Sequence, residues 1–267
     1  MNKKYVIVSD LDGTFLNSDS RPAQKNLPAI EKFKEAGNFF TIATGRYSIQ
    51  WSVYANAPVI LCNGAFMHDP QTGDILNERS FEGAPMYEIL KDINAKFPDS
   101  FVRYTDRRDI HYLNFDKNDD IGDMWYKVVY ESIRSGSRDT NYRRADLYDI
   151  FEYISSKHGS RFRYNFSSPH LFEVLQPQAS KGISIGDLKV YFKKRGIDTE
   201  IYAVGDYEND IEMLEAADVA VCPSNALPEV VEMVRQRAEK DGSGIIAATN
   251  DSGTIADLIE KIMGTEV

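Results

Sequence analysis

The 267-residue sequence predicts an α/β protein whose parallel sheet is interrupted by an inserted α+β domain. Two observations predict this fold class. Apolar strand-like runs alternate with helical patterns at both ends of the chain, an order that is typical of a parallel sheet covered by helices. Between about residues 83 and 178, long aromatic and arginine-rich segments alternate with period two, which indicates an antiparallel sheet. We therefore expect residues 1–82 and 179–267 to form the core, and residues 83–178 to form the insert.

Each expected element follows from a short pattern. In the core we expect strands at 5–9, 38–43, 59–62, 201–204 and 219–221, and helices from Asn26 to a C-cap at Gly37, at 184–195 and at 211–216. In the insert we expect helices at 85–97 and 146–158. They accompany two extended segments, FVRYTDRRDIHYLNF and RFRYNFSSPHLFEVL. Hinges are expected near 81–85 and 176–180, where the chain passes between core and insert.

The composition excludes several classes of protein. A hydrophobic content of 42% fits a globular protein with a sizeable core, and a formal net charge of -10 disfavours binding to nucleic acid or to an anionic membrane. The sequence contains no apolar run of membrane-spanning length and no secretory signal pattern, so we expect a cytoplasmic protein. Cys62 and Cys222 lie in apolar contexts outside any metal-binding spacing, which indicates reduced core thiols.

Polar residues follow strand after strand of the predicted core. Because ligands of parallel α/β sheets bind beyond the carboxyl ends of the strands, these residues are expected to converge on one rim. Lys181 stands just before the helix expected at 184–195. The residues that follow the strands are Asp10, Asp12, Gly13 and Thr14, then Thr44, Gly45 and Arg46, then Asn63 and Gly64, and finally Asp206, Asn209 and Asp210.

The chemistry of this set points to phosphoryl transfer. Several carboxylates share one site only if a cation offsets their charge, and a site rich in oxygen atoms without His or Cys favours Mg²⁺. The Thr44 hydroxyl, the Lys181 ammonium and the loop N–H groups near Gly13 and Gly45 are suited to an anion. In this interpretation Asp10 is the nucleophile that forms an aspartyl-phosphate, and Asp12 is the general acid and base.

Other interpretations remain for individual residues. Arg46 fits a surface ion pair nearly as well as a substrate contact, and Asn63 could shape a turn with Gly64. Asp206 and Asp210 could cap the helix that follows them. Lys181 at a helix start opposes the helix dipole, an arrangement that an anion nearby would make favourable.

The ordered motifs resemble those of the haloacid dehalogenase (HAD) superfamily, in particular the Cof-type (IIB) hydrolases. The motifs are Asp10-Leu11-Asp12-Gly13-Thr14, Thr44-Gly45-Arg46, Lys181-Gly182 and Gly205-Asp206-Tyr207-Glu208-Asn209-Asp210. NGAFM and PSNALPEV also look like that subfamily, whereas Gln178-Ala179-Ser180 and Tyr207 depart from its usual pattern. The resemblance implies a Rossmann-like core, a C2B-type cap, and Mg²⁺ held by Asp10, the Asp12 backbone carbonyl and Asp206, with Asp210 nearby.

We expect a Mg²⁺-dependent phosphatase of small phosphorylated metabolites, with sugar phosphates favoured and with pyridoxal phosphate and flavin or nucleotide monophosphates open. The alternatives are a phosphomutase of the same fold and a non-catalytic binding protein. Gly13, Gly45, Arg46, Asn63 and Asn209 are the expected substrate contacts. The cap candidates for substrate selection are Arg103, His111, Arg161, Arg163 and Asn165. We expect a monomer or a weak homodimer.

Overall fold

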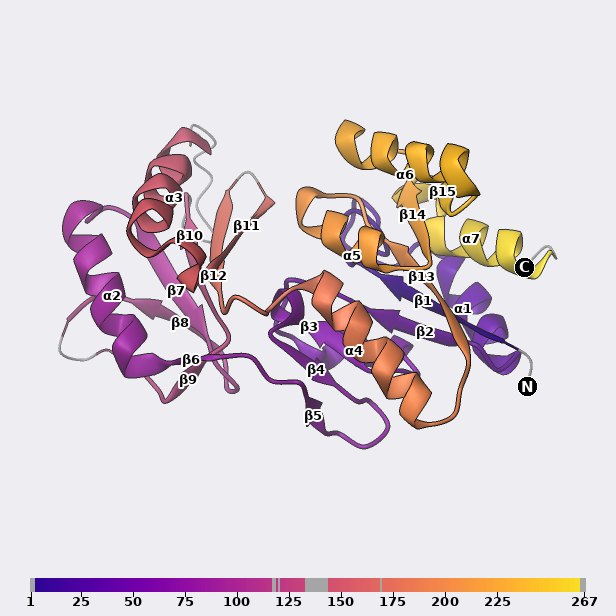
Figure 1. The fold of residues 1–267 in the computed structure, drawn as a ribbon, viewed down its shortest axis with the longest axis horizontal. Helices are drawn as coiled ribbons and strands as arrows, with labels where there is room; N and C mark the ends of the chain where they lie inside the picture. The colour runs from indigo at the N-terminus through magenta and orange to yellow at the C-terminus, as the bar shows by residue number, and fades with distance from the viewer. Residues whose placement is uncertain (1–2, 117–118, 120, 133–143, 169, 265–267) are drawn as a thin grey trace. The chain divides into compact units, whose positions relative to one another are not determined.

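The computed structural model describes residues 3–116, 119, 121–132, 144–168 and 170–264. The chain divides into two compact units: the core unit, up to Asn77 and from Ser180 onward, and the insert unit, Glu78–Ala179. Figure 1 shows the elements of both. None of the helices in the described part of the chain is long and apolar enough to cross a membrane.

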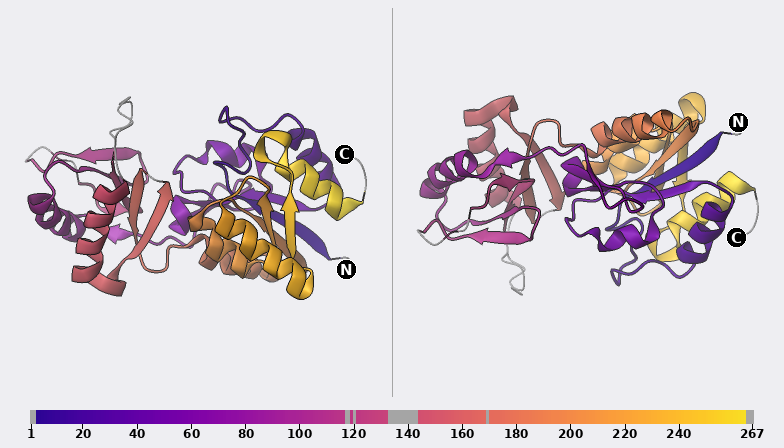
Figure 2. Two further views of the ribbon diagram at one scale, coloured as in Figure 1. Left: turned by 90° about the horizontal axis from the view of Figure 1, so that it is seen from above. Right: turned by 90° about the horizontal axis from the view of Figure 1, so that it is seen from below.

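The core unit is built on a parallel sheet with the strand order β15-β14-β13-β1-β2. Its helices and strands are β1 (Lys4–Ser9), α1 (Asn26–Glu35), β2 (Phe39–Ile42), β3 (Val59–Leu61), β4 (Phe66–His68), β5 (Ile75–Leu76), α4 (Lys181–Lys194), β13 (Thr199–Val204), α5 (Ile211–Ala216), β14 (Val219–Pro223), α6 (Pro228–Asp241), β15 (Gly244–Ala247) and α7 (Thr254–Met263). In both views of Figure 2, α4 and α5 lie on one side of these strands, and α1 and α7 lie on the other. The predicted α/β class with a parallel sheet is confirmed.

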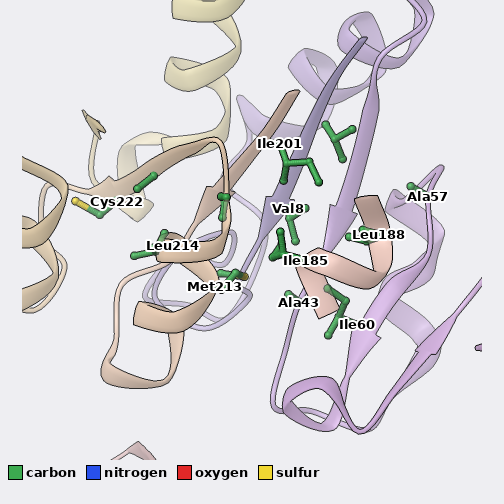
Figure 3. Packing of buried hydrophobic residues seen from close by; sticks show 14 of the residues in the cluster. Val8, Ala43, Ala57, Ile60, Ile185, Leu188, Ile201, Met213, Leu214 and Cys222 are labelled. Carbon is green, nitrogen blue, oxygen red and sulfur yellow. The ribbon is translucent and has the colours of Figure 1, made fainter. Parts of the chain in front are cut away.

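Alternate residues of the central strands supply the core on each face, as the period-two geometry of a strand requires. Val8 and Ile201 pack against Ile185 and Leu188 of α4 and against Met213 of α5, in the cluster drawn in Figure 3. Cys62 and Cys222 are buried and reduced, as the composition predicts. Because the sheet is covered on both faces, its polar residues can gather only at the strand ends.

The third predicted strand joins the structure differently from a regular ladder strand. β3 pairs antiparallel with β4, in a small sheet of order β3-β4-β5, and touches the main sheet through one parallel bridge, Ala43↔Ile60.

Two helices, α6 and α7, lie where no element is predicted. Helix α4 begins at Lys181, earlier than predicted, because the Ser180 side chain accepts hydrogen bonds from the N–H groups of Gly182 and Ile183.

The insert unit is an antiparallel sheet packed against two helices. The sheet has the order β11-β12-β10-β7-β8, with every pair antiparallel. The helices α2 and α3 contribute Leu90 and Ile154 to a core shared with Tyr104, Tyr130 and Phe172 of the sheet. The elements are β6 (Phe81–Glu82), α2 (Gly83–Lys96), β7 (Phe101–Thr105), β8 (Ile110–Leu113), β9 (Met124–Trp125), β10 (Lys127–Glu131), α3 (Arg144–His158), β11 (Arg163–Ser168) and β12 (Leu171–Leu175).

Both period-two segments fold into hairpins, β7–β8 and β11–β12, and β10 lies between them in the sheet. No strand is predicted at 127–131, because Lys127 and Glu131 flank only three apolar residues and the segment does not read as a buried strand. The structure buries both charges in ion pairs, Lys127 with Glu173 at 2.5 Å and Glu131 with Arg103. Buried charges are tolerated when they are paired in this way.

Candidate active site

Asp10 directly follows strand β1, and its N–H donates to the carbonyl of Val204 in the neighbouring strand β13. This bond holds the Asp10 backbone at the carboxyl edge of the parallel sheet. Asp206 follows the same edge two residues after β13 ends. The sheet therefore brings together two carboxylates that are far apart in the sequence, as predicted from the strand ends.

Lys181 is the central cation of this cluster. Its Nζ donates to Oδ1 of Asp10 and to Oδ1 of Asp210, each at 2.6 Å, and its side chain is 1% exposed. Asp10 and Asp210 are buried as well. Helix α4 begins at Lys181, so the cation lies at a helix start, and the two carboxylates offset its unfavourable interaction with the helix dipole.

Asp210 shapes the loop after β13. Its Oδ2 accepts hydrogen bonds from the N–H groups of Asp206 and Tyr207 at 3.0 and 3.2 Å, while its Oδ1 accepts from Lys181. Gly205 is needed beside it, since a Cβ there would lie 2.5 Å from the Cβ of Asp210. Both carboxylate oxygens of Asp210 are thus engaged by the protein itself.

Carboxylate oxygens of Asp10, Asp206 and Asp210 lie within 4.8 Å of one another, a spacing that could hold a metal ion. The Thr14 hydroxyl donates to Oδ1 of Asp206 at 2.6 Å. Gly13 has a φ of +84°, and a Cβ there would lie 2.4 Å from Oδ2 of Asp206. The glycine therefore permits the left-handed turn and keeps side-chain atoms away from this oxygen.

Asp10, Asp206 and Lys181 have perturbed pKa values. Burial, together with the neighbouring Asp210 and Asp206, raises the pKa of Asp10 well above its usual range, and Lys181 only partly opposes this shift. Burial and Asp210 raise the pKa of Asp206 to about 7. Burial lowers the pKa of Lys181, but the carboxylates of Asp10 and Asp210 outweigh burial and the pKa is raised. Such crowding of acids is what a dication would relieve.

Two further pairs complete the rim. Arg46 donates from Nε and Nη2 to the two carboxylate oxygens of Asp12 at 2.9 and 2.5 Å. Asn209 donates from Nδ2 to Oδ1 of Asn63 at 3.3 Å. Asn63 itself has a φ of 54°, a left-handed conformation that asparagine tolerates better than most residues.

Thr44 and Gly45 lie in the loop that leads from β2 to η1 (Ile49–Tyr54), a short 3₁₀ helix. The Thr44 hydroxyl accepts a hydrogen bond from the N–H of Arg46 at 3.0 Å, and a Cβ on Gly45 would lie 3.2 Å from Nδ2 of Asn63. Of the predicted site residues, Asp10, Lys181, Asp206 and Asp210 form one cluster, with Gly13 against Asp206. The predicted residues Asp12 and Arg46 form a pair, as do Asn63 and Asn209.

Comparison with known proteins identifies the family of the chain. The profile of the haloacid dehalogenase-like hydrolases matches residues 7–256. The chain belongs to this family. A curated relative, the 5-amino-6-(5-phospho-D-ribitylamino)uracil phosphatase YitU of Bacillus subtilis, is 27% identical, and the match covers 97% of each chain.

Solved structures of haloacid dehalogenase-like hydrolases share the fold. One from Bacteroides thetaiotaomicron superposes with a TM-score of 0.77 at 20% identity, covering 97% of this chain and 100% of the other. A sugar phosphatase of subclass IIB superposes with a TM-score of 0.71 at 16% identity, covering 98% and 99% of the two chains. The predicted Cof-type membership, the C2B-type cap fold and the enzyme class, a phosphoric monoester hydrolase, are confirmed.

Thr14 was expected at this rim without an assigned role, whereas Trp51 was not among the predicted site residues. Thr14 bonds to Asp206, and the Trp51 ring lies beneath the guanidinium of Arg46, with 5.7 Å between Cζ and the ring centroid. The DGT triplet was a signal for Thr14. Nothing in the sequence distinguishes Trp51 from a core aromatic residue.

Proposed function

We propose that this hydrolase is a Mg²⁺-dependent phosphatase that releases phosphate from small phosphorylated metabolites, foremost sugar phosphates, through an aspartyl-phosphate on Asp10. One observation carries the proposal. Asp10 is held in a buried cluster in which Lys181 bridges it to Asp210, and Asp206 lies close enough to share a cation with both. A carboxylate fixed beside a cation in this way is suited to attack a phosphorus atom.

In the first step a carboxylate oxygen of Asp10 bonds to the phosphorus, and the bond from phosphorus to the leaving oxygen breaks. Asp12 gives its proton to that oxygen. In the second step Asp12, now ionised, takes a proton from a water molecule whose oxygen bonds to the phosphorus. The bond between phosphorus and Asp10 then breaks, which releases phosphate and restores the Asp10 carboxylate. Lys181 offsets the charge near Asp10 in both steps.

The donor set fits Mg²⁺. Asp10 and Asp206 offer hard oxygen ligands in a buried site without sulfur or imidazole, and Gly13 leaves the space beside Asp206 clear of side-chain atoms. The two oxygens of Asp210 are engaged by Lys181 and by loop N–H groups, so we assign Asp210 to support of the site more than to direct ligation. Bound Mg²⁺ would neutralise charge on the phosphoryl oxygens.

We assign phosphate and substrate contacts to the remaining rim residues. The Thr44 hydroxyl and the N–H groups of the loops at Gly13 and Gly45 can donate to phosphoryl oxygens. Asn63 and Asn209 are joined by an amide hydrogen bond, and we assign this pair to a polar group of the substrate.

Substrate selection is assigned to the cap sheet, specifically to the face that its helices leave uncovered. The register pairs Arg103 with Tyr112 and Asn165 with Glu173, and all four alternate with Tyr104, Val174 and other residues of the helix-covered core. His111 pairs with Tyr104 and stacks on its ring at 4.8 Å, so it belongs to the helix-covered face. Arg103 and Asn165 are therefore stronger candidates than His111.

A phosphomutase would need unpaired cations in the cap for a second phosphate. Three of the cap arginines instead lie against carboxylates of the same unit: Arg103 against Glu131, Arg107 against Glu78 and Arg108 against Asp106. The names of the relatives also favour hydrolysis, since they describe a ribitylaminouracil phosphatase and a sugar phosphatase. A binding protein without activity would have no need for the Asp10, Asp12 and Lys181 set.

The test is phosphate release from a panel of sugar, nucleotide, pyridoxal and flavin phosphates, with Mg²⁺ and with chelator. Asp10→Asn is the variant, and Glu232→Gln on the exposed surface of α6 is the matched control. Release that requires both Mg²⁺ and Asp10 supports the proposal. Release that persists in Asp10→Asn, or that is absent from every compound, contradicts it.

A further inference from the structure

Arg46 lies between the carboxylate of Asp12 and the ring of Trp51. Its guanidinium makes two hydrogen bonds to Asp12, one to each carboxylate oxygen, and its Cζ is 5.7 Å from the centroid of the Trp51 ring. A guanidinium with both contacts has little freedom to rotate, because the paired bonds fix its plane and the ring supports it from another direction.

The Trp51 ring is in turn fixed to the core. It stacks on Tyr54 with 6.3 Å between centroids, Tyr54 packs edge-on against Phe15 at 5.5 Å, and Phe15 packs on Phe40 of β2 at the same distance. Phe15 and Phe40 are fully buried. Phe15 lies in the same loop as Asp12. The stacked rings therefore connect this loop, through Trp51 and Arg46, to the Asp12 carboxylate.

Stability alone does not account for this arrangement. The side chains of Arg46 and Asp12 are 41% and 57% exposed, whereas the Asp10 side chain is 10% exposed, and exposed ion pairs contribute little to folding. Bidentate pairing supported by a ring is, however, an effective way to hold an exposed carboxylate in one direction. Asp12 also lies outside the set of Asp10, Asp206 and Asp210.

We propose that Arg46 is a positioning residue that acts through Asp12, and that Trp51 holds Arg46 in place for this purpose. The inference rests on the proposed function, in which Asp12 transfers a proton to the leaving oxygen. It replaces the sequence-based expectation that Arg46 contacts the substrate. The guanidinium keeps the Asp12 carboxylate aligned for both proton transfers.

A phosphate contact by Arg46 and the positioning of Asp12 by Arg46 can be distinguished, because they predict different losses of activity on different esters when Arg46 is replaced. A contact with the phosphoryl group is shared by every phosphate ester, so its loss weakens all of them alike. Alignment of the acid matters most when the leaving oxygen is strongly basic and must receive a proton. Benzyl phosphate and p-nitrophenyl phosphate are matched probes, since they are similar in size but only the first releases a strongly basic oxygen.

The experiment measures kcat/KM for both esters in wild type, Arg46→Met, Arg46→Lys, Trp51→Leu and Asp12→Asn. Arg235→Met is the control, an exposed arginine on α6 that pairs with Glu232. We expect Arg46→Met to lower the value for benzyl phosphate about 30-fold and that for p-nitrophenyl phosphate about 3-fold, a fraction of what a general acid contributes. Arg46→Lys and Trp51→Leu should show the same selectivity to a smaller extent, and Asp12→Asn to a larger extent.

Each other outcome overturns a defined part of the argument. Equal losses on both esters in Arg46→Met would make Arg46 a phosphate contact, and no loss on either would make it a surface ion pair. If Asp12→Asn shows no selectivity, the proposed proton transfer by Asp12 fails and the inference with it. Selectivity in Asp12→Asn without selectivity in Arg46→Met overturns the inference alone. Circular dichroism of each variant shows whether it is folded.

Discussion

Nζ of Lys181 lies 2.6 Å from Oδ1 of Asp10, although the two residues are 171 positions apart in the sequence. The same ammonium reaches Asp210 at 2.6 Å, and all three side chains are buried. One buried cation thus faces two buried carboxylates, with the Asp206 carboxylate close by. Under the proposed function, this one cluster would serve stability, metal binding and catalysis, which separate experiments can distinguish.

Lys181→Met should both destabilise the core and inactivate the enzyme. Removing one partner of a buried ion pair typically costs about 3–5 kcal/mol, because the remaining charges stay buried without compensation. We expect kcat/KM to fall about 100- to 1,000-fold, as for the loss of a charge-stabilising donor. Urea unfolding with and without Mg²⁺ is the measurement. Mg²⁺ should stabilise the variant more than wild type, and equal stability of the two proteins without Mg²⁺ would contradict this account.

Mg²⁺ should bind the acidic cluster in the absence of substrate. Saturating Mg²⁺, at about 100 times its dissociation constant, would stabilise the wild-type protein by about 2.7 kcal/mol, since the unfolded chain has no such site. Asp206→Asn should lose most of this gain, whereas Glu232→Gln on α6 should keep it. Calorimetric titration with MgCl₂ and thermal unfolding provide the measurement. An undiminished Mg²⁺ effect in Asp206→Asn would place the metal elsewhere.

Gly13→Ala should weaken Mg²⁺ binding and activity together. The alanine would need a φ of +84°, a conformation that costs about 1–3 kcal/mol, and its Cβ would lie 2.4 Å from Oδ2 of Asp206. Gly186→Ala is the matched control, because this glycine lies inside α4 and nothing lies within 4 Å of a Cβ there. The control should stabilise the protein by about 0.5–1 kcal/mol through helix propensity. Normal Mg²⁺ affinity in Gly13→Ala would show that this space is not needed.

Asp106 should stabilise the cap in a pH-dependent manner. Burial by itself raises the pKa of this carboxyl, but hydrogen bonds from the N–H groups of Asp109 and Arg108 outweigh it and lower the pKa to about 2. Since the folded pKa lies below the ordinary value of 3.8, the stabilisation is present above that value and is lost as the pH falls through about 2. Asp106→Asn should therefore cost about 1–3 kcal/mol near neutral pH, and the cost should shrink with acidification.

Fluorescence can report on the cap alone for this test. The chain has two tryptophans, and in a Trp51→Phe background only Trp125, which is buried in the cap core, remains. Urea titrations from about pH 5.5 down to about pH 2.5 would compare the variant with Asp99→Asn at an exposed position. A cost that stays constant over this range would rule out the assigned hydrogen bonds as its source.

Much of the fold follows from local patterns. The alternation of strands and helices predicted the parallel core, and the period-two segments predicted an antiparallel insert. The missed elements have physical reasons. Strand β10 carries Lys127 and Glu131 inside an apolar run, and its burial depends on partners in β7 and β12 that no local pattern shows. Helix α6 had a local signal in the sequence, because Pro228 stands at its start. Strand β3 forms a hairpin with β4 and has no regular ladder with the main sheet, a choice of partner that its own sequence does not show.

By itself the sequence determined which polar residues belong to the site and at which edge of the sheet they lie. Each polar residue of the site follows an apolar strand or opens a helix, and parallel strands bring such ends to one edge. Only the tertiary structure decided which residues pair. Lys181 donates hydrogen bonds to both Asp10 and Asp210, and Arg46 donates to Asp12. His111 lies on the helix-covered face of the cap sheet. These choices depend on strand register and side-chain direction across long sequence separations, which local periodicity does not encode.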